Sequence, residues 1–209
     1  MSGALSSEVG ADWKELPSIV HTPASYVEAL RFDDVFDIPR PVELEIGSGD
    51  GSFLARYAEL NRGTNFLGIE RLLGRLRKLD KKARKLGLDN LKIIRLEAAY
   101  FTAYLLPPRS LRAIHIYFPD PWPKAKHERH RLIQPEFLKS ARRALADGGT
   151  LYLRTDDVTY FEQMLEVCGA AEGFEPVTTP DELAAVTTDF EREFNAEGKP
   201  TNRAAYRRV

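Results

Sequence analysis

Three glycines at alternate positions follow a short apolar segment and could bring the backbone close to a ligand. They are Gly47, Gly49 and Gly51, in the run Glu45-Ile46-Gly47-Ser48-Gly49-Asp50-Gly51. Glycine tolerates positive φ and lacks the Cβ that would hold a ligand away. A dinucleotide fingerprint would instead read G-x-G-x-x-G, with a helix N-terminus receiving the pyrophosphate. The alternate spacing therefore favours a different nucleotide cofactor.

Acidic residues close the first three expected strands. Glu45 stands two positions before the first glycine, where a carboxylate would repel a pyrophosphate but suits the cationic amino-acid end of S-adenosylmethionine. Glu70 ends the second strand and could accept both ribose hydroxyls of an adenosine. Glu97 ends the third strand, where it could contact adenine. Each residue taken singly could be a surface carboxylate, but together with the glycines they predict an S-adenosylmethionine site.

A strip rich in proline follows the fourth expected strand and reads Phe118-Pro119-Asp120-Pro121-Trp122-Pro123-Lys124. Proline fixes φ, so three alternate prolines predict an extended loop with little entropy left to lose on binding. Asp120 could accept hydrogen bonds from a base edge, Trp122 could stack on a base, and Lys124 could meet a phosphate. The alternative is a structural proline turn with a packed indole. The position of the strip at the same sheet edge as the glycines favours a site for a target base.

Basic residues are concentrated in two segments although the net charge of the chain is only -1. Residues 71–85 contain eight basic residues and one acidic residue, and residues 124–143 contain seven basic and two acidic residues. A polyanion responds to the local field rather than to the total charge. A solvated helix face is the alternative for 71–85. The second basic segment beside the strip favours RNA binding, with Lys78 and Lys82 as expected contacts.

Strand and helix patterns alternate along the chain, which predicts a parallel sheet covered by helices on both faces. In such sheets ligands bind beyond the carboxyl ends of the strands. The N-terminal forty residues are interrupted by prolines and predict a tail plus a short helix. The expected strands are Val42–Ile46, Asn65–Ile69, Leu91–Leu96, Leu111–Phe118 and Thr150–Arg154, and the expected helices are Ser52–Leu60, Leu72–Leu86, Pro135–Ala146 and Val158–Ala170.

The bulk composition is that of a cytoplasmic protein of one domain. The 209 residues contain 43% hydrophobic and 29% charged residues, and no apolar run approaches the length of a membrane span. Residues 1–10 do not have the pattern of a signal peptide. The single cysteine, Cys168, excludes an internal disulfide, and the four histidines form no ligand pattern, so we expect no metal.

These motifs resemble those of the bacterial tRNA (guanine-N7-)-methyltransferase family from about Val42 to Gly198. The strip with His127 and Arg131 resembles the most specific signature of the family. Further matches are Glu45-Ile46-Gly47, Gly68-Ile69-Glu70, Thr155-Asp156, and Thr188-Asp189-Phe190-Glu191 followed by Gly198, which resembles the Thr-Lys-Phe-Glu segment of the family. The resemblance implies a Rossmann-like class I S-adenosylmethionine methyltransferase fold, with a mostly parallel seven-stranded sheet and helices on both faces.

The resemblance also implies roles for individual residues. Glu45, Glu70, Glu97 and Asp120 would contact S-adenosylmethionine or line its site, and the residues that would engage tRNA are Lys124, Asp156, Thr188, Asp189, Phe190 and Glu191. Residues 1–40 would be an N-terminal extension, and residues 41–209 a single methyltransferase domain with a tRNA-contacting segment at 187–198. Glu97 stands where the family usually has Asp, and Asp189 stands where many members carry a basic residue.

The implied reaction is methyl transfer to N7 of a guanosine in tRNA, in the variable loop. N7 keeps an in-plane lone pair and has no proton to lose, so in-line attack needs no general base. Proximity and orientation would then supply about 7–11 kcal/mol. Asp120 is the expected catalytic residue, and it could either stabilise the developing positive charge or hold the base edge, with Asp156 as a second candidate. Cys168 lies late in an expected helix, which argues against cysteine-dependent methylation of a pyrimidine carbon.

Other functions remain open on the residues alone. The first alternative is a methyltransferase that acts on another RNA, on a protein or on a small molecule. A non-catalytic RNA-binding module and a nicotinamide-dependent oxidoreductase are further alternatives, opposed by the glycine spacing and by Asp120. Both a monomer and a homodimer are compatible with the sequence.

Overall fold

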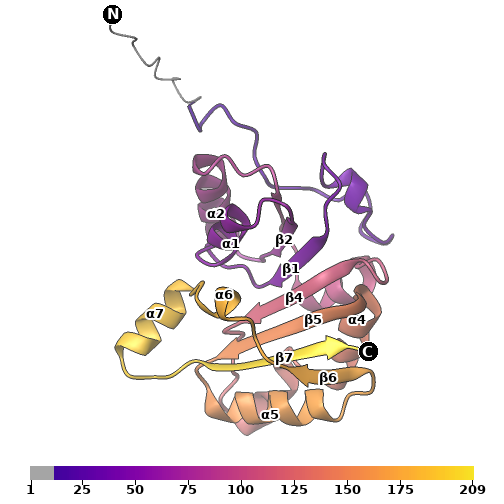
Figure 1. Cartoon of the computed structure of the whole chain (residues 1–209), viewed down its shortest axis with the longest axis vertical. Helices are drawn as coiled ribbons and strands as arrows, with labels where there is room; N and C mark the ends of the chain where they lie inside the picture. The colour runs from indigo at the N-terminus through magenta and orange to yellow at the C-terminus, as the bar shows by residue number, and fades with distance from the viewer. Residues whose placement is uncertain (1–11) are drawn as a thin grey trace, which may run out of the picture.

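A seven-stranded sheet forms the centre of the computed structural model, which describes residues 12–209. The strands lie in the order β3-β2-β1-β4-β5-β7-β6. The first five pair in parallel, whereas β7 is antiparallel to both β5 and β6 (Figure 1). Their bounds are β1 Val42–Ile46, β2 Asn65–Ile69, β3 Leu91–Ile94, β4 Leu111–Tyr117, β5 Leu145–Thr155, β6 Phe174–Val177 and β7 Asn202–Arg208.

Helices cover both faces of this sheet, as the sequence predicts. Their bounds are α1 Leu54–Leu60, α2 Leu73–Lys85, α3 Ala98–Tyr100, α4 Pro135–Ala144, α5 Val158–Gly169, α6 Asp181–Ala184 and α7 Asp189–Ala196, with short turns of 3-10 or π helix at Phe32–Asp34 (η1), Phe101–Leu105 (η2) and Ala125–His130 (η3). Apolar residues of α4, α5 and η2 pack on one face and those of α1, α2 and α6 on the other. The fold class is therefore confirmed.

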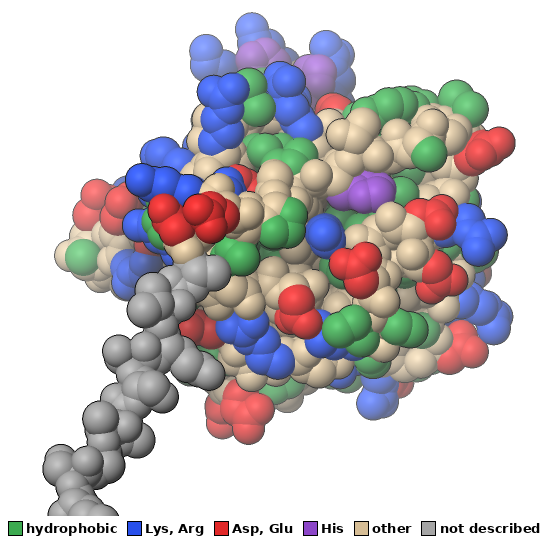
Figure 2. All heavy atoms as spheres, turned by 90° about the horizontal axis from the view of Figure 1, so that it is seen from above, with side chains coloured by type: hydrophobic (Ala, Val, Ile, Leu, Met, Phe, Trp, Pro, Cys, Tyr) green, Lys and Arg blue, Asp and Glu red, His purple; other side chains and the backbone are tan. Residues whose placement is uncertain are grey.

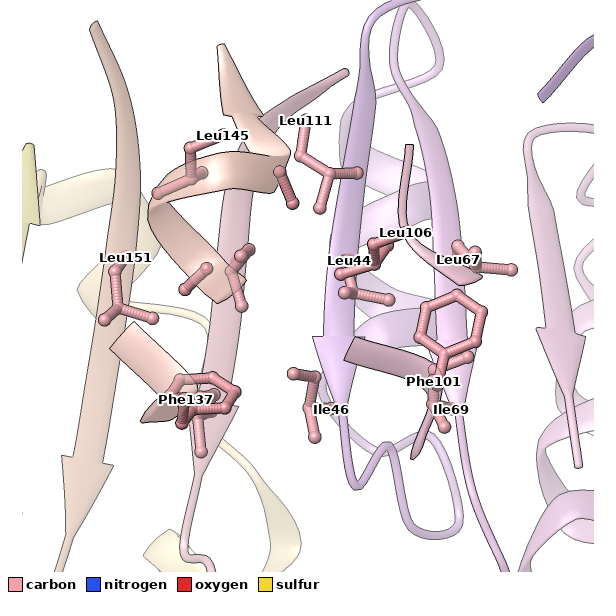
Figure 3. Close-up of a cluster of buried hydrophobic side chains, with 14 of the residues drawn as sticks. Leu44, Ile46, Leu67, Ile69, Phe101, Leu106, Leu111, Phe137, Leu145 and Leu151 are labelled. Atoms are coloured by element: carbon pink, nitrogen blue, oxygen red, sulfur yellow. The ribbon is translucent and has the colours of Figure 1, made fainter. Parts of the chain in front are cut away.

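Alternation along β1 separates an apolar face from a polar one. Leu44 and Ile46 enter the core beneath α4 and η2, where Figure 3 shows them near Leu67, Phe101 and Phe137. Successive strand residues point to opposite faces, so Glu43 and Glu45 point the other way. Both glutamates are buried. The sheet therefore carries ionisable groups inside the layer formed by α1, α2 and α6.

The strand order reverses between β1 and β4, because β2 and β3 follow β1 to one side and β5 lies beyond β4 on the other. A crevice opens at such a reversal beyond the carboxyl ends of the two strands. β1 leads directly into the glycine turn, and β4 leads directly into the proline strip. The topology therefore brings the two strongest sequence motifs to the same crevice.

Most expected elements are present with small differences in length. Two strands have the expected bounds, and the third and fourth end earlier, at Ile94 and Tyr117. The helix expected to run to Ala146 ends at Ala144, because Leu145 is extended and pairs with Leu111. The sequence pattern does not predict the positions of β6, β7, α3, α6 and α7.

The described part of the N-terminal extension lies along α2 and the edge of the sheet. Val20 forms a bridge with Ile93 of β3, and the Asp80 carboxylate of α2 accepts hydrogen bonds from Ser18 and Ile19. Between residues 12 and 40 the only helical segment is the 3-10 turn η1. The prediction for residues 1–10 lies outside the described residues. Within the described chain, no helix combines the length and apolarity needed to cross a membrane.

Candidate functional site

The glycine turn after β1 uses its glycines in different ways. Gly47, Gly49 and Gly51 all have positive φ, at 76°, 55° and 76°. A Cβ on Gly47 would meet open space, whereas a Cβ on Gly51 would overlap the Leu79 side chain of α2. Gly47 therefore leaves room for a ligand, and Gly51 permits close packing of the turn on α2.

A cavity of about 800 Å³ opens at the reversal of strand order. Its volume lies in the usual range for small-molecule sites. It is lined by the ends of β1, β2 and β4, by α3 and η2, by the strip, and by the start of α4. Of the predicted site residues, the ones that line it are Gly47, Glu70, Glu97 and Asp120. Gly49 and Gly51 do not line it, and Gly51 instead faces a second hollow between α1, α2 and α7.

Glu45 lies just beneath this cavity in an unfavourable environment for a negative charge. Its side chain is only 4% exposed, and its Oε2 has no hydrogen-bond partner. Burial raises the pKa of Glu45 to about 8, and the nearby carboxylates of Glu70 and Asp50 add to the rise while Arg154 opposes it. A buried carboxylate oxygen without a partner is costly, so this site would gain from a cationic ligand.

Glu70 and Glu97 each order the backbone that surrounds the cavity. Glu70 accepts hydrogen bonds from Gly49 N at 3.0 Å and from Leu72 N at 2.7 Å, which ties the glycine turn to the start of α2. Glu97 is exposed and caps α3 by accepting from Tyr100 N at 2.8 Å. Each carboxylate oxygen has more than one lone pair, so these bonds leave acceptor capacity for a ligand.

The strip is not uniformly extended, and this prediction was wrong at two positions. Phe118 and Trp122 have φ values of 51° and 46°, in the left-handed region that bulky residues seldom adopt. Such a conformation costs about 1–3 kcal/mol and persists only where surrounding contacts hold it. Asp120 and Trp122 both line the cavity, but Lys124 does not, because the chain turns at Trp122 before it enters η3.

Aromatic and basic side chains surround the mouth of the cavity beside Trp122. The indole is 38% exposed, and its ring centroid lies 5.1 Å from that of His130 and 6.0 Å from that of His127. Lys124, Lys126 and Arg129 are exposed on the same segment. Figure 2 shows Lys and Arg side chains gathered with histidines in a projection at one edge of the molecule. This edge suits a base next to a phosphate backbone.

The segment expected to contact tRNA contains residues in very different environments. Thr188 caps α7 by accepting from Glu191 N at 2.9 Å. Glu191 is completely buried, and its carboxylate pairs with Arg154 at 3.0 Å and with Arg203. Neither residue lines the cavity. Thr188 and Glu191 therefore both make structural contacts, and their contact with a substrate stays a prediction.

Phe190, Asp189 and Asp156 are the more accessible members of the predicted set. Phe190 is 43% exposed, and the Arg75 guanidinium lies 5.8 Å from its ring centroid. Asp189 donates its backbone N–H to Ser52 Oγ at 3.0 Å, which seats α7 on the end of the glycine turn. Asp156 is half-buried just after β5. None of the three lines the cavity, so any contact with a substrate would lie at its margin.

Two buried arginines hold segments near the site; no role was predicted for Arg154, whereas Arg131 belongs to the signature that includes the strip. Arg154 donates to the carbonyls of Val186 and Leu183 as well as to Glu191, and so holds the segment between α6 and α7 on the sheet. Arg131 donates to the carbonyl of Pro121 in the strip. An arginine within an apolar strand, as at 154, is the sequence signal that could have identified the first.

The basic helix α2 is divided into two halves. Near its C-terminus the cations of Lys81, Arg84 and Lys85 surround the ring of Trp13, and Lys82 pairs with Asp50 at 2.9 Å. In the N-terminal half, the exposed basic residues are Arg75, Arg77 and Lys78; Arg75 lines the cavity, as does Arg71, which precedes the helix. The half nearer the cavity is thus the part free for RNA.

Cys168 lies on the buried face of α5 and is part of the core, as expected. Burial raises the pKa of its thiol to about 12, so the group stays protonated and is a poor nucleophile. His115 is also buried, within hydrogen-bond distance of Glu43 and Tyr117. Among residues 12–209 no cluster of His, Cys, Asp and Glu has an arrangement that could hold a metal ion.

Comparisons with known proteins show the family and the fold of the chain. A family model described as "Putative methyltransferase" matches residues 39–204. A protein of Geobacter metallireducens, named tRNA (guanine-N(7)-)-methyltransferase, is 35% identical over 198 residues, which cover 92% of this chain and 91% of the relative. A protein of Chromohalobacter salexigens with the same name is 36% identical over 87% of this chain and 72% of the relative. The solved structure of the 16S rRNA methyltransferase KamB, at 18% identity, shares the fold with a TM-score of 0.61 over 85% of this chain and 91% of that one.

Proposed function

The chain belongs to the family of bacterial tRNA (guanine-N7-)-methyltransferases, and we propose that it methylates N7 of a guanosine in the variable loop of tRNA. The observation that carries this proposal is the single cavity shared by the glycine turn and the strip. Gly47 and Glu70 line this cavity together with Asp120 and Trp122. A methyl donor and a base held by these residues would meet inside one enclosed space.

The residues present fit S-adenosylmethionine as the cofactor. Glu45 offers a buried carboxylate oxygen without a partner, which suits the ammonium group of the cofactor. Gly47 leaves open space where a side chain would intrude. Glu70 and Glu97 face the same cavity with acceptor oxygens for ribose and adenine. The bound cofactor would supply an electrophilic methyl group on its sulfonium.

The protein would act by orientation rather than by proton transfer. Guanine N7 attacks with an in-plane lone pair and loses no proton. Trp122 can stack on the target base, and Asp120, exposed to the cavity beside it, can either hold the base edge or stabilise the positive charge that develops. No cysteine nucleophile is required, which agrees with the buried and protonated thiol of Cys168.

The tRNA would approach over the two basic segments that flank the cavity. Lys124, Lys126 and Arg129 lie on the strip side, and Arg71 and Arg75 lie on the α2 side. Phosphate contacts of this kind position a nucleic acid without reading its sequence. We retain Asp156 and residues 188–191 as proposed tRNA contacts at the margin of the cavity. A cytoplasmic location, as monomer or homodimer, completes the proposal.

The decisive experiment incubates the protein with unmodified tRNA and labelled S-adenosylmethionine and then maps the methylated base. We expect label on N7 of one guanosine in the variable loop. Asp120→Ala serves as the matched variant, and we expect it to lose at least about 100-fold in turnover, a typical effect of removing one charge-stabilising group, while keeping its melting temperature. Label on another RNA or on another atom, or wild-type turnover by Asp120→Ala, would contradict the assignment.

A further inference from the structure

The peptide bond between Pro121 and Trp122 has a particular place in the strip. Asp120 precedes it and Trp122 follows it, and both line the cavity. Proline fixes φ at position 121, and φ at Trp122 is 46°. The orientation of this one peptide therefore sets the direction of Trp122 relative to Asp120, the two side chains proposed to hold the base.

Arg131 holds that peptide by its carbonyl. Its Nε donates to Pro121 O at 2.8 Å, ten residues away in sequence. On its other side the guanidinium donates to Gln163 Oε1 of α5 at 2.6 Å and lies 5.0 Å from the ring centroid of Tyr160. Glu128 lies 3.6 Å away and provides an opposite charge. The arginine therefore links the strip to the rigid layer formed by α5.

The guanidinium of Arg131 is buried, so it does not serve as a surface charge. Arg131 is only 4% exposed, and arginine is seldom buried unless its donors are paired. Two of its contacts are with α5 and one is the ion pair with Glu128, while the other is with the carbonyl of Pro121, which an unfavourable backbone angle follows. A left-handed Trp122 persists only where its surroundings hold it. Arg131 supplies a contact that can do so.

We propose that Arg131 is a positioning residue for the methyl-transfer reaction, which acts by fixing the Pro121–Trp122 peptide so that Asp120 and Trp122 face the cavity. The expected effect on turnover rests on the proposed function, whereas the expected effect on the conformation of the strip does not. Without the contact, the peptide can rotate and Trp122 can leave the left-handed region. A displacement of about 1 Å at the reacting centre can lower a rate about 100-fold.

The chain offers a direct probe of this geometry, because its two tryptophans are Trp13 and Trp122. Trp13→Phe leaves Trp122 as the only indole and keeps an aromatic ring beside the cations of α2. In this background we expect Arg131→Gln to shift the emission maximum of Trp122 and to change its quenching by acrylamide. Cofactor affinity measured by calorimetry should change less than about twofold, while turnover with tRNA should fall about 10- to 100-fold.

Arg208→Gln in the same background is the matched control. Arg208 is likewise buried at 8% exposure and donates to a backbone carbonyl, that of Leu145, but it does not line the cavity. We expect it to lower stability while leaving Trp122 emission and turnover per folded molecule unchanged. Arg131→Lys retains the charge with fewer donors, and it provides the same comparison if the glutamine variant does not fold.

The outcomes separate the two proposals. Unchanged Trp122 emission and turnover in both Arg131 variants would overturn the positioning role. The positioning role would also be overturned if the Arg131 and Arg208 variants lost turnover equally and only in proportion to the fraction of unfolded protein. If Arg131→Gln alters Trp122 emission but the parent protein does not methylate tRNA, the positioning role stands and the proposed function fails.

Discussion

At the scale of single residues, Glu45 combines a buried position with a carboxylate oxygen that lacks a partner. Burial raises its pKa from the ordinary 4.5 to about 8. Between these two values the folded protein keeps the proton and the unfolded chain has released it. The contribution of Glu45 to stability is therefore complete below about pH 4.5 and is lost as the pH rises through about 8.

We accordingly expect Glu45→Gln to flatten the pH dependence of stability. The melting temperature of the variant should fall less than that of the parent between pH 5 and about 8, because glutamine has no proton to lose. Thermal unfolding across this pH range measures the difference. Glu175→Gln, which alters a surface carboxylate paired with Arg207, is the control. Parallel curves for Glu45→Gln and the parent would contradict the shifted pKa.

Glu191 leads to a second prediction at this scale, because two arginines depend on its carboxylate. Arg154 is only 1% exposed, so removal of its partner leaves a buried cation uncompensated. Breaking a buried ion pair on one side costs about 3–5 kcal/mol. We expect a loss of that size in the free energy of unfolding of Glu191→Gln, measured with urea. Glu175→Gln should lose no more than about 1 kcal/mol, and an equal loss in both variants would refute the structural role.

At the scale of elements, α2 shows that one basic helix can have two surroundings. Charge counting predicted Lys78 and Lys82 as contacts for RNA, but Lys82 pairs with Asp50 and the cations near the C-terminus surround Trp13. Arg75, by contrast, lines the cavity. The axial distance from Arg75 to Lys85 is about 15 Å at 1.5 Å per residue, which exceeds a Debye length of about 8 Å. We therefore expect Arg75 and Lys85 to act separately toward a polyanion.

This division predicts different effects of charge reversal along one helix. Arg75→Glu and Lys78→Glu should each weaken tRNA binding and reduce the salt slope by about 1, the effect of losing one phosphate contact. Lys85→Glu, the control on the same helix, should change the slope much less. Filter binding or anisotropy over a series of salt concentrations gives the slopes. Equal effects of Arg75→Glu and Lys85→Glu would contradict an RNA surface confined to the half beside the cavity.

At the scale of the whole molecule, the last strand is an interior one. β7 lies between β5 and β6 and pairs with both, as Figure 1 shows at the C-terminus. It also contributes Arg203 to Glu191 and Arg208 to the carbonyl of Leu145. β7 therefore joins β6 to the rest of the sheet.

We expect a chain ending at Gly198 to lose cooperative folding. Without β7, the edge of β5 is unpaired and β6 has no partner in the sheet. Circular dichroism during thermal unfolding should show a broad transition or none. Removal of Val209 alone, which is exposed, is the control and should preserve the transition. A cooperative transition in the chain ending at Gly198 would show that β7 is dispensable.

The sequence by itself determined the features that depend on neighbouring residues. The bounds of β1 and β2, the glycine turn and the basic helix follow from apolar periodicity and local residue types, and the alternation of strands and helices predicted the sheet. It also identified Gly47, Glu70, Glu97 and Asp120 as residues near the cavity, because each lies shortly after the end of a parallel strand.

Only the tertiary structure decided the features that depend on residues far apart in the chain. β6 contains a proline and β7 contains several arginines, so neither has a clear strand pattern. They are strands because β7 pairs with β5 and β6 pairs with β7. The burial of Glu191 depends on Arg154 and Arg203, and the left-handed Trp122 follows the Pro121 carbonyl held by Arg131. Residue types indicate local conformational preference. The burial of a side chain and the identity of its partners depend on which distant segments pack against it.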